Sequence, residues 1–219
     1  MEEHKRPAPA PAPILRLILG DQLSGYHSWY KETNPQIVYV MMEIKPETSY
    51  VTHHVQKLVG VLSAMRLFAA RLQEAGHRVA YWKLTDSDNR QSFAGNLGLM
   101  IARFRARALE YQTPDEWRLQ VLLAQELPAL GIEVREVSTE HFLSGPGDFR
   151  LGQRMETFYR GIRKKTGFLM DGTEPWGGIW NYDTENRKPW KGTPLPPPAP
   201  DFPIHKSLRT LVLEDLDQA

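Results

Sequence analysis

Hydrophobic residues gather in short runs along the first two thirds of the chain, with polar or helix-patterned sequence between them. Runs of roughly four to eight apolar, β-branched or aromatic residues are typical of buried strands. The runs that we interpret as strands are Ile14–Leu19, Gln36–Met42, Arg78–Leu84, Ala108–Gln112 and Ile132–Val137.

Between these runs the apolar positions recur every three or four residues, which is the spacing of one helix face. This spacing predicts a long helix over His54–Ala75, with Gly76 as a left-handed cap, and a second helix over Ser92–Phe104. The apolar face of the long helix consists of Leu58, Val61, Leu62, Met65, Phe68 and Leu72.

A third helix is predicted from the segment that follows the fourth strand. Thr113 can cap it, Pro114 suits the first helical position, and Glu116 stands where a capping box requires it. This helix should run to Leu130 and stop at Gly131. Strands that alternate with such helices indicate an α/β fold, a Rossmann-like parallel sheet with helices on both faces.

The pattern changes after about residue 145, where a basic and aromatic sequence begins. A helix is expected over Gly152–Thr166 and another over Ile204–Ala219. The predicted organisation is a disordered Pro/Ala lead (1–13), the α/β domain (14–150), a basic, aromatic extension packing on that domain (151–191), and a Pro-rich linker with a short tail (192–219).

Composition limits the classes of protein that remain. The chain has 219 residues, of which 41% are hydrophobic and 24% charged, as in ordinary soluble domains. A net charge of +1 argues against a surface built wholly for nucleic acid. The absence of cysteine excludes disulfides, thiolate zinc sites and cysteine-ligated iron-sulfur clusters within this chain. No run has the length of a membrane span and the N-terminus lacks a signal peptide's apolar core, so we expect a cytoplasmic protein.

Candidate chemistry lies where the first two predicted strands end. Ligands of open parallel sheets bind beyond the carboxyl ends of the strands. Gly20 and Asp21 occupy that place after the first strand, and Glu43 and Glu47 follow the second. A turn with a helix cap, and ordinary surface carboxylates, are the alternative interpretations of these residues. Neither a dinucleotide nor a P-loop glycine motif occurs here.

Two other kinds of site are disfavoured by spacing. His53 and His54 are adjacent, so on a helix their side chains would point about 100° apart and make a poor metal pair. No G-x-S-x-G nucleophile motif is present. We therefore predict no metal site and no catalytic nucleophile.

The basic segment combines cations with aromatic residues. Such runs are most often solvated faces, but interleaved aromatic residues favour a surface that contacts DNA or another domain. The residues predicted for this contact are Arg160, Arg163, Lys164, Lys165, Trp180 and Arg187.

Several longer motifs resemble one family. They are LILGDQLS (17–24), ETSYVxHH (47–54), SAMRxFAxxL (63–72), PDEWR (114–118), the Arg154–Arg160 segment, KTGxLMDG (165–172) and GGIWNYDTENRKP (177–189). Together they resemble the N-terminal domain of the deoxyribodipyrimidine photolyase-related proteins, which include the iron-sulfur bacterial cryptochromes and prokaryotic (6-4) photolyases.

This resemblance implies a function that composition and spacing do not show. In the family, the N-terminal domain holds an antenna chromophore, 6,7-dimethyl-8-ribityllumazine. A separate helical domain, the lyase part, holds FAD and an iron-sulfur cluster and carries out light-driven DNA repair. Carried over by alignment, the chromophore site falls on Gly20, Asp21, Met42, Glu47 and Val61. We expect neither FAD nor an iron-sulfur cluster in this chain.

Three hypotheses remain open from the sequence. The first is a chromophore-binding module that acts with a separately encoded FAD domain. The second is a truncated or degenerate photolyase gene product without activity. The third is a small α/β hydrolase or transferase that uses Asp21 and Glu47 as acid and base. The 154–189 surface is expected either to form a homodimer contact or to cause aggregation, with weak nonspecific DNA binding as a lesser alternative.

Overall fold

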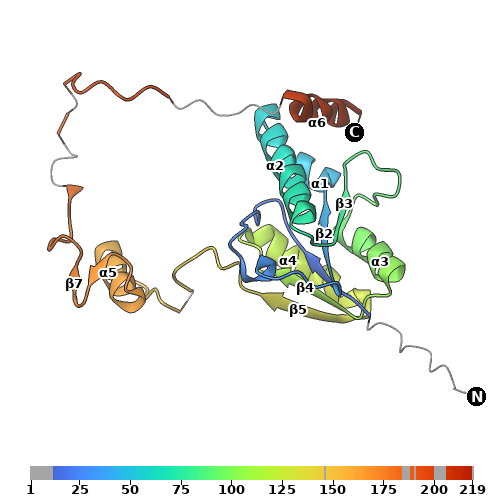
Figure 1. Ribbon diagram of the computed structural model, residues 1–219, viewed down its shortest axis with the longest axis horizontal. Helices are drawn as coiled ribbons and strands as arrows, with labels where there is room; N and C mark the ends of the chain where they lie inside the picture. The colour runs from blue at the N-terminus through green and yellow to red at the C-terminus, as the bar shows by residue number, and fades with distance from the viewer. Residues whose placement is uncertain (1–11, 146, 184–187, 190, 200–205, 219) are drawn as a thin grey trace, which may run out of the picture. The chain divides into compact units, whose positions relative to one another are not determined.

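The computed structural model describes most of the chain (Figure 1). The described residues are 12–145, 147–183, 188–189, 191–199 and 206–218. Residues 1–11, the larger part of the predicted disordered lead, lie outside this description, as does Arg187. Contacts divide the chain into two compact units, one made of the residues up to Thr139 together with Ile204–Ala219, the other of Glu140–Pro203.

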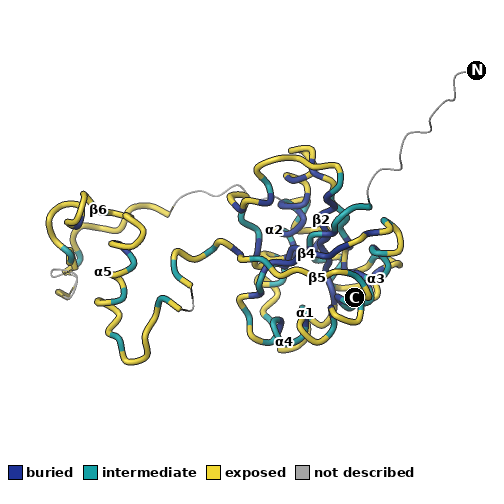
Figure 2. The backbone as a smooth tube through the Cα atoms, turned by 90° about the horizontal axis from the view of Figure 1, so that it is seen from below, coloured by how far each residue is buried: buried dark blue, intermediate teal, exposed yellow. Residues whose placement is uncertain are grey.

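The first unit is built on a five-stranded parallel sheet in the order β3-β2-β1-β4-β5. Its strands are β1 (Ile14–Leu17), β2 (Ile37–Met42), β3 (Val79–Trp82), β4 (Ala108–Gln112) and β5 (Glu133–Val137). Each lies within the corresponding predicted run. β2 and β4 are buried along their whole length, as strands covered on both faces should be (Figure 2).

Helices cover the sheet on both faces and confirm the predicted Rossmann-like class. One core cluster joins the sheet to α3 and α4, while the other joins it to α2, α6 and the short turn η1. The bounds are η1 (Ser28–Tyr30), α1 (Lys45–Ser49), α2 (Val55–Glu74), α3 (Phe93–Phe104), α4 (Trp117–Glu126), η2 (Leu127–Leu130) and α6 (Lys206–Gln218).

The first two predicted helices are capped at residues that stand at the predicted helix ends. Ser92 caps α3 by accepting a hydrogen bond from the backbone N–H of Gly95. Gly76 follows α2 with φ of 88°, a conformation that a residue without Cβ adopts at no steric cost.

The predicted start of the third helix was wrong. Thr113 remains part of the sheet edge, because its N–H and its hydroxyl both donate to the carbonyl of Val137, at 2.8 and 3.1 Å. α4 begins at Trp117, and the side chain of its N-cap residue Glu116 makes no capping hydrogen bond. A long-range contact to β5 thus overrides the local capping pattern. α4 continues as the 3-10 helix η2, which ends at Gly131, a residue with φ of 70°.

The C-terminal helix predicted over Ile204–Ala219 is present as α6 and belongs to the first unit. It packs against α2, with Val212 fully buried and Leu208 and Leu216 half-buried beside it. The last helix of the chain therefore completes the core on this face of the sheet.

The second unit is small and largely exposed (Figure 2). It contains α5 (Met155–Thr166) and a short antiparallel pair, β6 (Met170–Asp171) and β7 (Glu174–Pro175), which the sequence did not predict. Among the described residues of both units, no helix has the length and apolarity needed to cross a bilayer.

Candidate functional site

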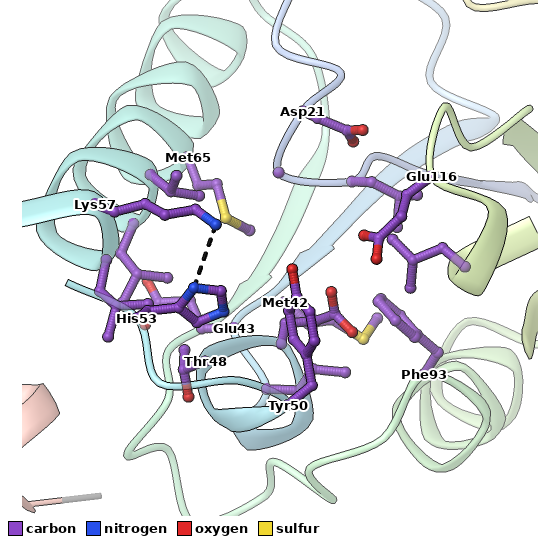
Figure 3. Close-up of a pocket in the computed structure, with 18 of the residues that line it drawn as sticks. Asp21, Met42, Glu43, Thr48, Tyr50, His53, Lys57, Met65, Phe93 and Glu116 are labelled. Atoms are coloured by element: carbon purple, nitrogen blue, oxygen red, sulfur yellow. Dashed lines mark hydrogen bonds between the residues drawn. The ribbon is translucent and has the colours of Figure 1, made fainter. Parts of the chain in front are cut away.

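A cavity opens at the carboxyl ends of β1 and β2 (Figure 3). Its volume is about 320 Å³, and its walls come from the ends of these strands, from α1 and α2, and from the first residues of α3 and α4. All the residues that alignment assigned to the chromophore lie on its lining, namely Gly20, Asp21, Met42, Glu47 and Val61. Residues 41 positions apart in the sequence are thus brought around one space; we call it the β1–β2 cavity.

Apart from Glu43, the floor of the β1–β2 cavity is apolar. Its buried side chains come from the sheet, from α2 and from the starts of α3 and α4, and they are also part of the hydrophobic core. They are Ile18, Leu19, Met42, Ile44, Leu62, Met65, Phe93 and Leu119. Such a floor suits a flat, weakly polar ring system.

Gly20 lets the end of β1 approach α2 closely. A Cβ at this position would lie 3.1 Å from the sulfur of Met65 and 3.3 Å from Cγ1 of Val61. The glycine therefore allows the turn after β1 and the long helix to meet at the wall of the cavity. The element that approaches Gly20 is therefore α2.

The rim carries carboxylates that are fixed by an arginine. Arg118 donates to both oxygens of Glu47, at 2.8 and 2.7 Å, and to both oxygens of Glu116, at 2.8 and 3.2 Å. Its guanidinium lies 4.1 Å from the centre of the Tyr50 ring. The hydrogen bonds that Arg118 donates to Glu47, and then those to Glu116, raise the pKa of Arg118 above its usual value. Glu47 is therefore paired with Arg118 and is not a plain surface carboxylate. This pairing does not suit the hypothesis that Glu47 acts as a catalytic acid or base.

The opposite side of the cavity carries basic groups (Figure 3). Lys57 donates to Nδ1 of His53 at 3.2 Å, and the His53 ring meets the Tyr50 ring edge-on at 4.9 Å. His54 instead caps α2, because its Nδ1 accepts from the N–H of Gln56. Tyr50, His53 and Glu116 were not among the residues predicted for this site, although each stands inside one of the family motifs.

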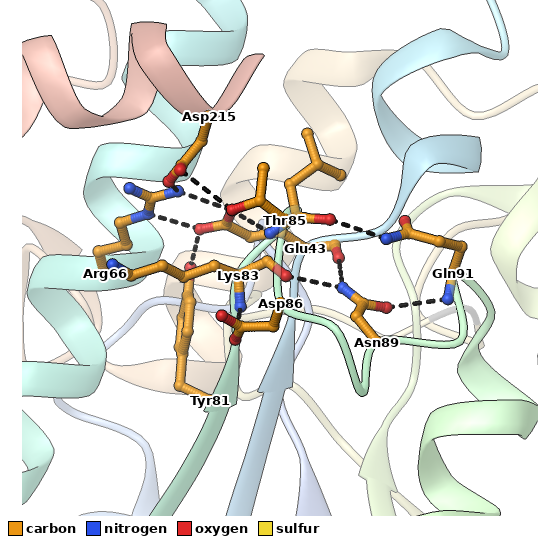
Figure 4. A network of polar contacts seen from close by, with 10 residues as sticks. Glu43, Arg66, Tyr81, Lys83, Thr85, Asp86, Asn89, Gln91 and Asp215 are labelled. Carbon is orange, nitrogen blue, oxygen red and sulfur yellow. Dashed lines mark hydrogen bonds and ion pairs between the residues drawn. The ribbon is translucent and has the colours of Figure 1, made fainter. Parts of the chain in front are cut away.

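Glu43 does not act as a surface carboxylate, and here the sequence-based interpretation was wrong. It lies on the lining of the β1–β2 cavity but is buried, and its carboxylate is held in a polar network (Figure 4). Arg66 donates to its two oxygens at 2.6 and 2.8 Å, the hydroxyl of Tyr81 donates at 2.6 Å, and the N–H of Leu84 at 2.9 Å. Burial, followed by the charge of Glu43, raises the pKa of the Tyr81 phenol, so this hydroxyl stays protonated and donates.

The same network reaches the C-terminal helix. Nη2 of Arg66 also donates to Asp215 of α6 at 2.6 Å, and the other oxygen of Asp215 accepts from the hydroxyl of Thr85 at 3.0 Å. α6 is thus attached both by apolar packing and by a shared ion pair. In the part of the chain that the structure describes, no group of three or more His, Asp or Glu side chains is arranged to hold a metal ion.

In the second unit the predicted contact residues gather around Trp180. Arg160, Arg163 and Lys164 lie 5.3, 5.1 and 5.7 Å from its ring centre. Arg163 is nevertheless buried and donates to the carbonyls of Phe168 and Leu169, so it fixes the turn that follows α5. Lys165 pairs with Asp148. Three of the predicted cations therefore surround Trp180, and two of the predicted cations, Arg163 and Lys165, make contacts within the second unit.

Fold and site together define a Rossmann-like α/β protein with a ligand-sized cavity at the carboxyl ends of its strands. Residues 16–219 match the family described as deoxyribodipyrimidine photo-lyase-related protein, and the chain belongs to this family. It is 39% identical over 205 residues to a (6-4) photolyase of Agrobacterium fabrum (strain C58 / ATCC 33970). That alignment covers 90% of this chain and 40% of the relative, so the chain spans less than half of the relative's length. The resemblance inferred from the motifs is confirmed.

Proposed function

We propose that the α/β unit is an antenna-chromophore-binding module of a light-dependent DNA repair or blue-light-sensing system, and that it takes 6,7-dimethyl-8-ribityllumazine in the β1–β2 cavity. The observation that carries this proposal is that all five residues assigned by alignment line this one cavity. When bound, such a group absorbs light and passes the excitation energy to a flavin, which in this proposal is held by a separate FAD domain.

The residues of the cavity fit such a ligand. A ribityllumazine has a flat ring system and a chain of hydroxyl groups, and it needs apolar walls with a few placed polar groups. The buried floor around Met42 and Met65 provides the walls, and the rim offers Asp21, Glu47 and Glu116 as acceptors for hydroxyl donors. A volume of about 320 Å³ is near the lower end of small-molecule sites, which suits a bicyclic ring.

Replacing Asp21 by alanine should weaken lumazine binding by about 1–3 kcal/mol, because a ribityl hydroxyl group that is buried in the complex would lose its hydrogen-bond acceptor. Titration of the purified protein, followed by the absorption or fluorescence of the lumazine, measures this loss. Asp88→Ala is the matched control, since Asp88 is exposed and is not part of the cavity lining, and it should leave the affinity unchanged.

The same titration tests the proposal as a whole. A saturable change in the lumazine spectrum with the wild-type protein supports it. If the wild type gives no saturable signal, chromophore binding has been lost in this chain, and the hypothesis of a degenerate photolyase product takes its place.

A further inference from the structure

We propose that the second unit contains a groove that binds a polyproline segment, and that its occupant is the Pro-rich segment of a second copy of this chain. The groove has a volume of about 400 Å³ and is lined by four aromatic rings, those of Tyr159, Trp176, Trp180 and Tyr182; we call it the aromatic groove. The Pro-rich segment is residues 194–200. The inference concerns a different unit from the β1–β2 cavity and does not depend on the chromophore.

The rings of the aromatic groove are held in place by contacts within the second unit. The hydroxyl of Tyr182 donates to the carbonyl of Trp176 at 3.0 Å. Gly177, with φ of 82°, makes this possible, because a Cβ at that position would overlap the Tyr182 hydroxyl. Arg163 lies 5.3 Å from the centre of the Tyr159 ring and donates to its hydroxyl at 3.1 Å. A groove that is already ordered loses little entropy when a ligand binds.

The aromatic groove offers what a polyproline II helix requires. This helix has no internal hydrogen bonds, so its carbonyls remain available to donors on a binding surface. Aromatic-lined grooves are one of the recurring ways in which proteins dock such a helix. The Trp176 ring is 68% exposed, and neither its indole N–H nor that of Trp180 donates to a residue that the structure describes. The groove therefore combines exposed rings with hydrogen-bond donors.

The Pro-rich segment has the composition of a polyproline II helix. Five of its seven residues are proline, which fixes its own φ and drives the residue before it to an extended conformation. With three residues per turn, Pro194, Pro197 and Pro200 would share one face of the helix. The described part, 194–199, forms neither helix nor strand, and Leu195 is 78% exposed. The segment is thus accessible to a partner.

The contacts of the cations favour a proline-rich occupant over nucleic acid. A single-stranded nucleic acid needs cations for its phosphates as well as rings for its bases. Arg160 pairs with Glu156, and Lys165 pairs with Asp148. Arg163 donates to two backbone carbonyls. The rings of the groove thus remain exposed while much of the positive charge nearby is engaged, which suits an uncharged ligand.

A second copy of the chain can supply this ligand. In the structure the Pro-rich segment of the same chain lies outside the aromatic groove, and both are exposed. Two copies that exchange their segments reciprocally would fill both grooves and form a closed, twofold dimer. Because the two contacts form in one complex, each raises the effective concentration of the other.

Sedimentation of the full chain over a range of concentrations tests the proposal. The mean mass should rise toward that of a dimer with increasing concentration. Trp176→Ala should weaken this association at least about tenfold, as loss of a central aromatic anchor does, and so should the double substitution Pro197→Ala and Pro198→Ala. Trp117→Ala is the matched control, because Trp117 is an exposed tryptophan of the first unit that is not part of the groove.

Mixing the two kinds of variant separates exchange from misfolding. Trp176→Ala keeps an intact Pro-rich segment, and the double proline variant keeps an intact aromatic groove. An equimolar mixture should therefore form a dimer with one intact contact, although each variant alone does not. A synthetic peptide of residues 192–201 should disperse the wild-type dimer.

Three results would overturn the inference. The first is a wild-type chain that stays monomeric at every concentration, and the second is a mixture of variants that does not associate. The third is evidence for another occupant, either loss of the dimer when Pro9 and Pro11 of the N-terminal lead are replaced by alanine, or dispersal of the dimer by a single-stranded oligonucleotide at low salt.

Discussion

Replacing Arg66 by alanine should lower the free energy of unfolding by about 3–5 kcal/mol, the usual effect of removing one partner from a buried ion pair. The side chain of Arg66 is 7% exposed and that of Glu43 is 0% exposed. Without the guanidinium, the Glu43 carboxylate would stay buried with the Tyr81 hydroxyl and the Leu84 N–H as the donors to its side chain, and Asp215 would lose its charged partner and keep the hydrogen bond from Thr85. Urea denaturation followed by circular dichroism measures the change.

The control lies on the same helix. Arg71 is exposed, so Arg71→Ala should change the free energy of unfolding by no more than about 0.5 kcal/mol. Asp215→Ala should lower the free energy of unfolding by less than Arg66→Ala does. Asp215 is more exposed than Glu43, and its removal leaves the bidentate pair of Arg66 and Glu43 intact. A loss below about 1 kcal/mol for Arg66→Ala would contradict the buried network described here.

Replacing Val61 by tryptophan should abolish lumazine binding, with a loss of affinity of roughly a hundredfold or more. Val61 lines the β1–β2 cavity from α2, and its Cγ1 already limits the space above Gly20. An indole at this position would occupy the volume that the ring system needs. Because Val61 is 39% exposed, the larger side chain can be accommodated without overpacking the core.

Val55→Trp is the matched substitution. Val55 begins the same helix, is 49% exposed and is not part of the cavity lining, so this variant should bind the chromophore as the wild type does. Binding by Val61→Trp with wild-type affinity would show that the chromophore does not occupy this cavity. Thermal unfolding of both variants checks that the effect is not a loss of folding.

The five strands and the long helix α2 of the first unit could be predicted from the sequence, because each depends on a pattern of near neighbours, whereas the short elements η1 and α1 were not predicted. The alternation and spacing of apolar residues placed β1 to β5 and α2, and the glycine at position 76 marked the end of α2. The start of α4 could not be read in the same way. The capping pattern at Thr113 is local, whereas the hydrogen bonds from Thr113 to Val137 join two strands and outcompete it.

The candidate site was only partly visible in the sequence. Gly20 and Asp21 could be found because they follow a strand, and alignment to the family added Met42, Glu47 and Val61. The roles of Glu43 and Glu47 could not be inferred, since a carboxylate beside a strand end has the same sequence pattern whether it is exposed or paired. The difference depends on which cation the fold brings to it.

By itself, the sequence determined the α/β class, the family and the strand ends at which a ligand would bind. Only the tertiary structure decided which charged side chains around this ligand site form ion pairs with one another. Arg118 reaches Glu47 across 71 positions of sequence, and Arg66 reaches Asp215 across 149. Such pairs form because the order of strands in the sheet and the packing of α6 on α2 bring distant residues together, and no local pattern of residues encodes that proximity.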